Sequence, residues 1–167
     1  NRTDANQTPT GDDDIGLLYR ATSVDGAQPV WTPVFTGPVG FHRIDILGDL
    51  GGYLYISHCD LDRGIAILRS ATGDAGTWQV VNEPGMDGSA ANSTAIVDGA
   101  TPYNGALYVA VGNRSAGARV WRMTGRLGAD GRVDWEPVGG PGLDNGANAY
   151  AELGVYKGYL YAWTSNY

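Results

Sequence analysis

The 167-residue chain has a mass of 17.6 kDa, which is the size of one domain. Charged residues make up 17% of it and the net charge is −7, so a nucleic-acid-binding protein, which needs a basic face, is not expected. No apolar run approaches the ~18 residues of a membrane span, and we expect no membrane insertion. The 26 Gly and 8 Pro are interleaved with Trp, Tyr, Val and Leu, a mixture typical of short strands joined by tight turns.

The cysteine content and the start of the sequence bear on the compartment. Cys59 is the only cysteine, so neither a disulfide within the chain nor a cysteine zinc cluster can form. The sequence begins at Asn1 without a charged-then-apolar leader, and we expect a processed or partial chain of a secreted or extracellular protein. Asn-x-Ser/Thr triplets would accept N-glycans in a secreted eukaryotic protein, and they begin at Asn1, Asn6, Asn92 and Asn113.

Short segments rich in aromatic and β-branched residues follow one another along the chain, and each is predicted to be a strand because Gly, Asp, Asn or Pro bounds it. In chain order they are 16–20, 31–34, a stretch from His42, 52–55, 64–69, 78–81, a stretch from Asn92, 105–108, 117–122, 135–138, a stretch from Asn148, and 158–161. No window keeps a 3.6-residue apolar period over the length of a helix, so the expected fold class is all-β.

The predicted strands are copies of a four-element repeat. The most regular element ends in a Leu-Tyr pair that starts at residue 54, 107 or 160, so successive pairs are 53 residues apart both times. Four strands in a unit of about 50 residues is the size of a β-propeller blade. We therefore predict propeller blades of four antiparallel strands each.

One turn carries a family resemblance. Residues 72–78, Thr-Gly-Asp-Ala-Gly-Thr-Trp, resemble the Asp-box of BNR or sialidase-type β-propellers, whose pattern Ser/Thr-x-Asp-x-Gly-x-Thr-Trp is one residue longer. Looser versions precede two other tryptophans, Trp31 and Trp135. The resemblance implies that the aspartate holds backbone N–H groups, the glycine permits a positive φ and the tryptophan fills the space between blades. The residues with these structural roles would be Asp25, Asp74, Gly76, Trp78, Asp130 and Trp135.

The order of the elements predicts an incomplete ring. The expected divisions are a polar N-terminal segment 1–15 and a propeller segment 16–167, which comprises an outer half-blade 16–36, a blade 37–83, a blade 84–140 and an inner half-blade 141–167. Because closed propellers have about 4–8 blades, these blade equivalents cannot close a ring. We expect a second polypeptide to complete it. A second copy would give a six-bladed homodimer, and a complementary propeller chain of different sequence is the alternative.

The third element of each repeat is predicted to be the innermost strand, which lines the central channel where propellers bind ligands. His42, Asn92 and Asn148 begin it, and charged and aromatic residues follow. The candidate ligand-binding residues at the channel mouth are His42, Arg43, Asp45, Asn92, Asn148, Tyr150 and Glu152. The alternative interpretation is that the His and Asn side chains cap exposed strand ends.

Two further groups of residues favour structural roles. Arg20, Arg69 and Arg122 invite comparison with the arginine triad of sialidases, but they occupy one repeat position, whereas a triad must converge from different positions. His58 and Cys59 are adjacent in a predicted strand and point to opposite faces, so they cannot easily share a metal or form a nucleophile pair.

A run of three carboxylates, Asp12, Asp13 and Asp14, could bind Ca²⁺, which prefers several oxygen ligands. The run does not follow the alternating spacing of a calcium loop, so a solvated acidic loop is preferred. No other metal or cofactor is expected.

Three functions fit these features. The first is a secreted or cell-surface, non-catalytic propeller module that binds a glycan or a protein partner at the channel mouth. The second is a hydrolase or lyase that acts on polysaccharide at the channel axis, although no catalytic residue can be assigned to it. The third is a structural assembly unit. The fold alone does not separate them, because one fold serves many functions.

Overall fold

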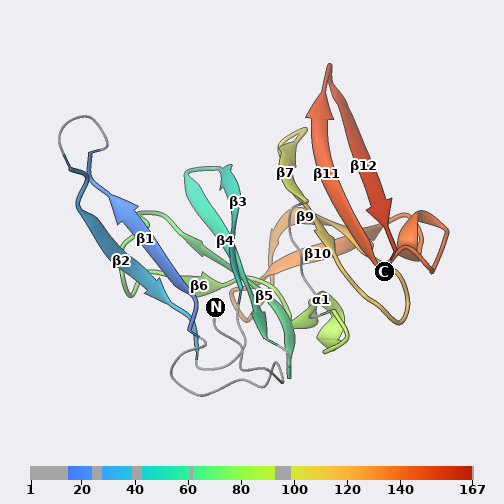
Figure 1. Cartoon of the computed structure of the whole chain (residues 1–167), viewed down its shortest axis with the longest axis horizontal. Coiled ribbons are helices and arrows are strands. Elements are labelled where there is room, and N and C mark those ends of the chain that lie inside the picture. The colour runs from blue at the N-terminus through green and yellow to red at the C-terminus, as the bar shows by residue number, and fades with distance from the viewer. Residues whose placement is uncertain (1–14, 24–27, 39–42, 61, 93–98, 167) are drawn as a thin grey trace.

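A computed structural model of the chain describes residues 15–23, 28–38, 43–60, 62–92 and 99–166 (Figure 1). Within these residues the protein is all-β, as predicted, and its strands form four antiparallel sheets. Each sheet uses strands that are consecutive in the sequence. Because antiparallel neighbours are joined by short turns, the Gly-rich connections suffice to link them.

The sheets follow one another in chain order. The first has two strands, β1 (Leu17–Ala21) and β2 (Trp31–Thr36). The second has four, β3 (Ile44–Leu50), β4 (Tyr53–Asp60), β5 (Gly64–Ser70) and β6 (Gln79–Val80). The third has four, β7 (Ala100–Tyr103), β8 (Ala106–Val111), β9 (Arg119–Leu127) and β10 (Val133–Val138). The fourth has two, β11 (Tyr150–Tyr156) and β12 (Tyr159–Ser165).

Two short helical turns precede the third and fourth sheets, α1 (Gly85–Gly88) and the 3₁₀ turn η2 (Pro141–Leu143). The strands of the four sheets lie within the predicted segments 16–36, 37–83, 84–140 and 141–167. The expected start of the third element is wrong in two repeats, since β7 begins at Ala100 and β11 at Tyr150. Asn92 and Asn148 instead lie in the segments that contain the helical turns, where their side chains bond to loop carbonyl groups.

The sheets pack face to face, and three apolar clusters lie between them. The largest cluster joins the second and third sheets and includes Tyr55, Ile67, Leu107 and Trp121. A smaller one joins the third and fourth sheets, and another joins the first and second. In β5 every residue except Arg69 is buried, because neighbouring sheets cover both faces of that strand. Residues 64–68 of this strand are accordingly apolar without alternation.

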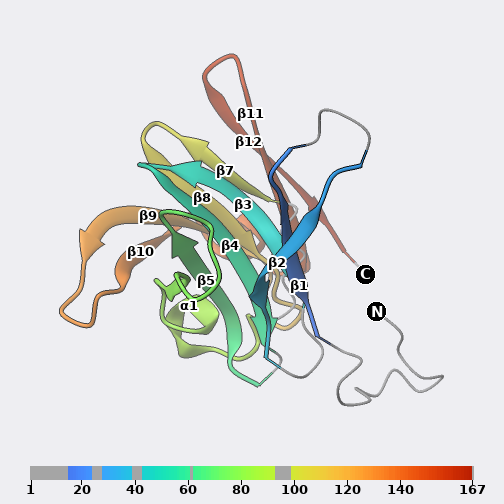
Figure 2. The same ribbon diagram turned by 90° about the vertical axis from the view of Figure 1, so that its left-hand side faces the viewer.

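The first strands of successive sheets lie together. β3 contacts β7, and β7 contacts β11; Figure 2 shows β3 and β7 side by side. In Figure 1 the two-stranded sheets occupy opposite ends of the molecule, with β1 and β2 on the left and β11 and β12 on the right. The described strands form no closed ring.

Asn82 extends the second sheet beyond its short last strand. Its Oδ1 atom accepts from Ile67 N at 2.6 Å, and its Nδ2 atom donates to Ile65 O at 3.1 Å. The side chain is fully buried. It therefore satisfies backbone groups of β5 where β6 has ended, and without it those groups would be buried unpaired, at a cost of about 1–3 kcal/mol each.

We expect Leu107→Ala to lower the free energy of unfolding by about 2–5 kcal/mol, because it leaves a cavity between the second and third sheets. Urea denaturation followed by circular dichroism measures this loss. Leu127→Ala is the matched control, since Leu127 is exposed and its truncation should change stability by no more than about 0.5 kcal/mol. Equal effects of the two substitutions would contradict the location of the core.

Candidate functional site

Arg43 and Asp45 form an ion pair at the start of β3. The Nε atom of Arg43 lies 2.7 Å from Oδ1 of Asp45, and the Asp45 side chain is mostly covered. An ion pair of this kind positions both side chains while leaving the guanidinium partly open to solvent. His42, which the sequence placed beside them, lies outside the described residues.

Asn92 and Asn148 hold the loops before the third and fourth sheets. Asn92 Nδ2 donates to Gly85 O at 2.7 Å, and Asn148 Nδ2 donates to Gly142 O at 2.8 Å. The main-chain oxygens of the two asparagines accept hydrogen bonds from Ile65 N and Ala118 N of the preceding sheet. Both amide nitrogens are therefore engaged within the fold, in loops that precede the strands, and neither side chain caps an exposed strand end.

The sequence carried a signal for this role that the prediction missed. Residues 84–92 and 141–148 share the pattern Pro-Gly-x-Asp followed by a terminal Asn. Each loop lies against a glycine of the preceding sheet, at the start of β5 or just before β9. A Cβ atom on Gly64 would stand 2.5 Å from Gly85 Cα, and one on Gly117 would stand 2.9 Å from Gly142 N, so neither position has room for a side chain.

Asn113 joins this network, although the sequence marked it only as a glycan acceptor. Its Nδ2 atom donates to Asn92 Oδ1 at 2.7 Å, and its Oδ1 atom accepts from the backbone nitrogens of Ser115 and Ala116. Asn92 and Asn113 are both buried. The two amides tie the turn after β8 to the loop after α1. Glycan attachment stays a prediction, and Asn1 and Asn6 lie outside the described residues.

Tyr150 and Glu152 lie on β11. The ring of Tyr150 is buried, and its hydroxyl oxygen accepts a hydrogen bond from Arg114 Nε. The guanidinium carbon of Arg114 also lies 5.6 Å from the centre of the Tyr150 ring, within range of a cation–π interaction. Glu152 is half-buried and faces Trp163 across the β11–β12 ladder. Tyr150 is thus a packed residue rather than an open stacking surface.

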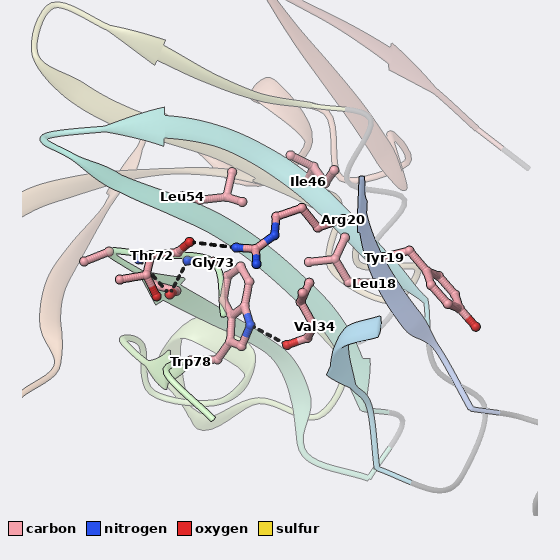
Figure 3. A pocket seen from close by; sticks show the side chains of 11 residues that line it. Leu18, Tyr19, Arg20, Val34, Ile46, Leu54, Thr72, Gly73 and Trp78 are labelled. Carbon is pink, nitrogen blue, oxygen red and sulfur yellow. Dashed lines mark hydrogen bonds between the residues drawn. The ribbon is translucent and has the colours of Figure 1, made fainter. Parts of the chain in front are cut away.

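A groove with a cavity volume of about 240 Å³ lies between the first and second sheets (Figure 3). Apolar side chains from both sheets line it, including Leu18 of β1 with Ile46 and Leu54 of the second sheet. Arg20 crosses the groove, and its Nη1 atom donates to Thr72 O at 3.3 Å. The sequence did not predict an open groove here, because it arises from how the two sheets meet.

The Asp-box-like turn borders this groove. Trp78 Nε1 donates to Val34 O of the first sheet at 2.9 Å, and Trp135 Nε1 donates to Val81 O at 3.3 Å, just beyond the last strand of the second sheet. Each tryptophan therefore links its sheet to the preceding one, and Gly76 has a positive φ of 79°. Asp25 lies outside the described residues.

The two described aspartates of these turns behave differently. Asp74 forms an ion pair with Arg20 of the neighbouring sheet, with Oδ1 and Nη2 2.8 Å apart. Asp130 Oδ1 accepts from Arg132 N at 3.1 Å, as the resemblance implied. In the turn that contains Asp74, hydroxyl groups accept from backbone nitrogens, since Ser70 Oγ accepts from Thr72 N and Gly73 N.

The three arginines at equivalent positions have separate partners. Arg20 pairs with Asp74, and Arg122 pairs with Glu136. The Arg69 guanidinium lies 4.3 Å from the centre of the Tyr53 ring. A hydrogen bond with Tyr108 and the charge of Glu136 raise the pKa of Arg122.

Clusters of His, Cys, Asp and Glu side chains bear on metal binding in the part of the chain that the structure describes. No group of three His, Cys, Asp or Glu side chains there could hold a metal ion. Asp12, Asp13 and Asp14 lie outside that part. The His58 ring stacks on Phe35 with ring centres 6.4 Å apart, and Cys59 is buried.

Comparisons of the chain with protein-family models, with curated proteins and with solved structures find no match. Among the described residues, no helix has both the length and the apolar character needed to cross a membrane.

The hydrogen bond with Thr72, followed by the hydrogen bond and charge of Arg20, lowers the pKa of the Asp74 carboxyl. We expect Thr72→Val and Arg20→Gln each to raise the Asp74 midpoint in an NMR titration, with Thr72→Val having the larger effect. Because the folded pKa lies below the unfolded one, the associated stabilisation is present above the unfolded pKa and is lost as the pH falls through the folded value.

Arg126→Gln is the control for this titration, because Arg126 pairs with Asp134 on the β9–β10 hairpin. It should leave the Asp74 midpoint unchanged. If neither Thr72→Val nor Arg20→Gln changed the Asp74 midpoint, the contacts assigned to this turn would be contradicted.

Proposed function

We propose that the chain is a non-catalytic interaction module built from β-propeller blades. The observation that supports the proposal is that β3, β7 and β11, the first strands of three successive sheets, form a contact series. In a propeller the first strand of each blade surrounds the central channel, and the later strands lead outward. The antiparallel strand order of the two four-stranded sheets, from first to fourth, is the order of such blades.

The binding site of this module is the channel mouth, where β3 and β11 begin. The candidate side chains there are charged: the partly exposed Arg43, which is paired with Asp45, and the half-buried Glu152. Charged side chains recognise a partner that offers hydrogen-bonding groups. A glycan has such groups on every ring. We therefore propose a secreted glycan-binding module, with a protein partner as the alternative.

Binding to an immobilised panel of neutral, uronic-acid-containing and sulfated oligosaccharides tests this site. We expect retention of at least one class by the 167-residue chain. The double variant Asp45→Ala/Glu152→Ala should weaken that binding by about tenfold or more, since it removes two hydrogen-bonding groups. Asp134→Ala is the matched control, because Asp134 lies on β10 in an exposed ion pair.

Absence of binding to every oligosaccharide would reject the glycan form of the proposal. Binding that the double variant leaves unchanged would place the site elsewhere. Negative-stain images test the architecture independently, because propeller blades should appear as a ring with a central channel.

A further inference from the structure

The first and last sheets each present a free strand edge. Among the described residues, β1 pairs only with β2, and β12 pairs only with β11. In the two four-stranded sheets, the equivalent strands pair with each other: β4 with β5 and β8 with β9. The end sheets therefore carry complementary halves of one pairing, since β12 corresponds to β4 and β8, and β1 corresponds to β5 and β9.

The ladder register indicates how these halves match. Tyr55 faces Arg69 in the second sheet, and Tyr108 faces Arg122 in the third. The repeat places Tyr161 of β12 and Arg20 of β1 at these same positions. The free edges thus carry the tyrosine and the arginine that face each other in both complete sheets.

The exposure of the end strands agrees with this correspondence. Tyr161 is 53% exposed, whereas Tyr55 at the equivalent position is 2% exposed. Tyr19 of β1 is 46% exposed, and its equivalents Leu68 and Trp121 are each 5% exposed. Edge strands with exposed aromatic residues readily pair with another chain.

An exposed apolar residue, Ile46, lines the groove between the first and second sheets. Ile46 is 63% exposed and faces Ile56 in the β3–β4 ladder. Its equivalent in the last sheet is Leu153, which faces Ala162. Leu153 packs on a cluster that contains Ala110 of β8 and Val120 of β9.

The residue equivalent to Ala110 on β12 is Trp163, which is exposed. The residue equivalent to Val120 is Leu18, which already lines the groove with Ile46. A strand added to the free edge of β1 in the repeat register would therefore bring a tryptophan over Ile46 and cover the groove.

We propose that β12 of one copy pairs antiparallel with β1 of a second copy, with Tyr161 facing Arg20, Ala162 facing Tyr19 and Trp163 facing Leu18. The inference rests on the proposed function in that it treats the sheets as blades and half-blades. Because each chain carries both edges, a two-fold axis generates two identical junctions. The indole of Trp163 then covers Ile46 of the second copy, which removes both apolar side chains from water.

A second copy is the partner that the structure supports, because both edges of the junction lie on this chain and match in register, apolar face and Tyr–Arg pair. A chain of different sequence would have to supply the same tyrosine opposite Arg20 and the same cover for Ile46. Such a chain is the alternative outcome of the mass measurement below.

The mass in solution, by size-exclusion chromatography with light scattering, is the first test. We expect twice the 17.6 kDa of one chain.

Trp163→Glu and Ile46→Glu should each raise the dimer dissociation constant by about tenfold or more, because each would place a carboxylate in the apolar junction. Both side chains are exposed in the single chain, so the fold should survive, and circular dichroism checks this. Leu127→Glu is the matched control, since Leu127 is also 63% exposed but lies outside the junction.

Disulfide trapping tests the register. Two pairs of cysteines are introduced in a Cys59→Ser background, one on each face of the proposed ladder. The first is Ala162→Cys with Tyr19→Cys, and the second is Trp163→Cys with Leu18→Cys. At least one should oxidise to a covalent dimer, since its Cβ atoms face each other. Leu160→Cys with Leu17→Cys, which is out of register, should remain uncrosslinked.

A wild-type chain that stays at 17.6 kDa would overturn pairing with a second copy. A dimer that tolerates both Trp163→Glu and Ile46→Glu, or that crosslinks only through the out-of-register pair, would overturn the junction. Failure of the proposed function is separate. A dimer that traps in register but shows no central channel in images would keep the junction and reject the propeller module, and one that binds no oligosaccharide would keep the junction and reject the glycan form.

Discussion

Face-to-face packing of successive sheets is the constraint on which the rest of this structure depends. A sheet buried on one face can alternate apolar and polar residues, but β5 is apolar on both faces because sheets cover it from both sides. The same demand applies at the ends of the chain, where Tyr19 and Tyr161 keep the apolar character of their equivalents without the cover. Among the described residues, each inner sheet packs against a neighbouring sheet on both faces, and each end sheet packs against one neighbouring sheet only.

Side chains that cross between sheets hold this stack in place. Trp78 and Trp135 each donate to a carbonyl oxygen of the preceding sheet, and Asn92 and Asn148 anchor the loops that connect one sheet to the next. These contacts orient the strands, and none of them involves the charged residues Arg43, Asp45 and Glu152. A rigid scaffold of this kind is the usual setting for a binding site.

Much of the fold could be predicted from the sequence, and less of the candidate site. The 53-residue spacing of the Leu-Tyr pairs indicated the repeat, and Gly and Pro marked its turns, so the all-β class and the chain order of the strands were predictable. The roles of Asn92, Asn113 and Asn148 were not, because an asparagine before a strand looks the same whether it faces a ligand or bonds to a loop carbonyl. Gly85 and Gly142 belong to the same loops as Asn92 and Asn148, but the path of each loop depends on the sheet against which it lies.

The sequence by itself determined which segments are strands and which positions are equivalent, because both follow from local propensity and from a repeated pattern. Only the tertiary structure decided which of the equivalent apolar residues are buried. Tyr55 and Tyr161 have the same place in the repeat, yet one is enclosed by the next sheet and the other is exposed. Burial depends on what lies against a face, and that neighbour is distant in the sequence or, at the two ends, belongs to another molecule in the pairing we propose.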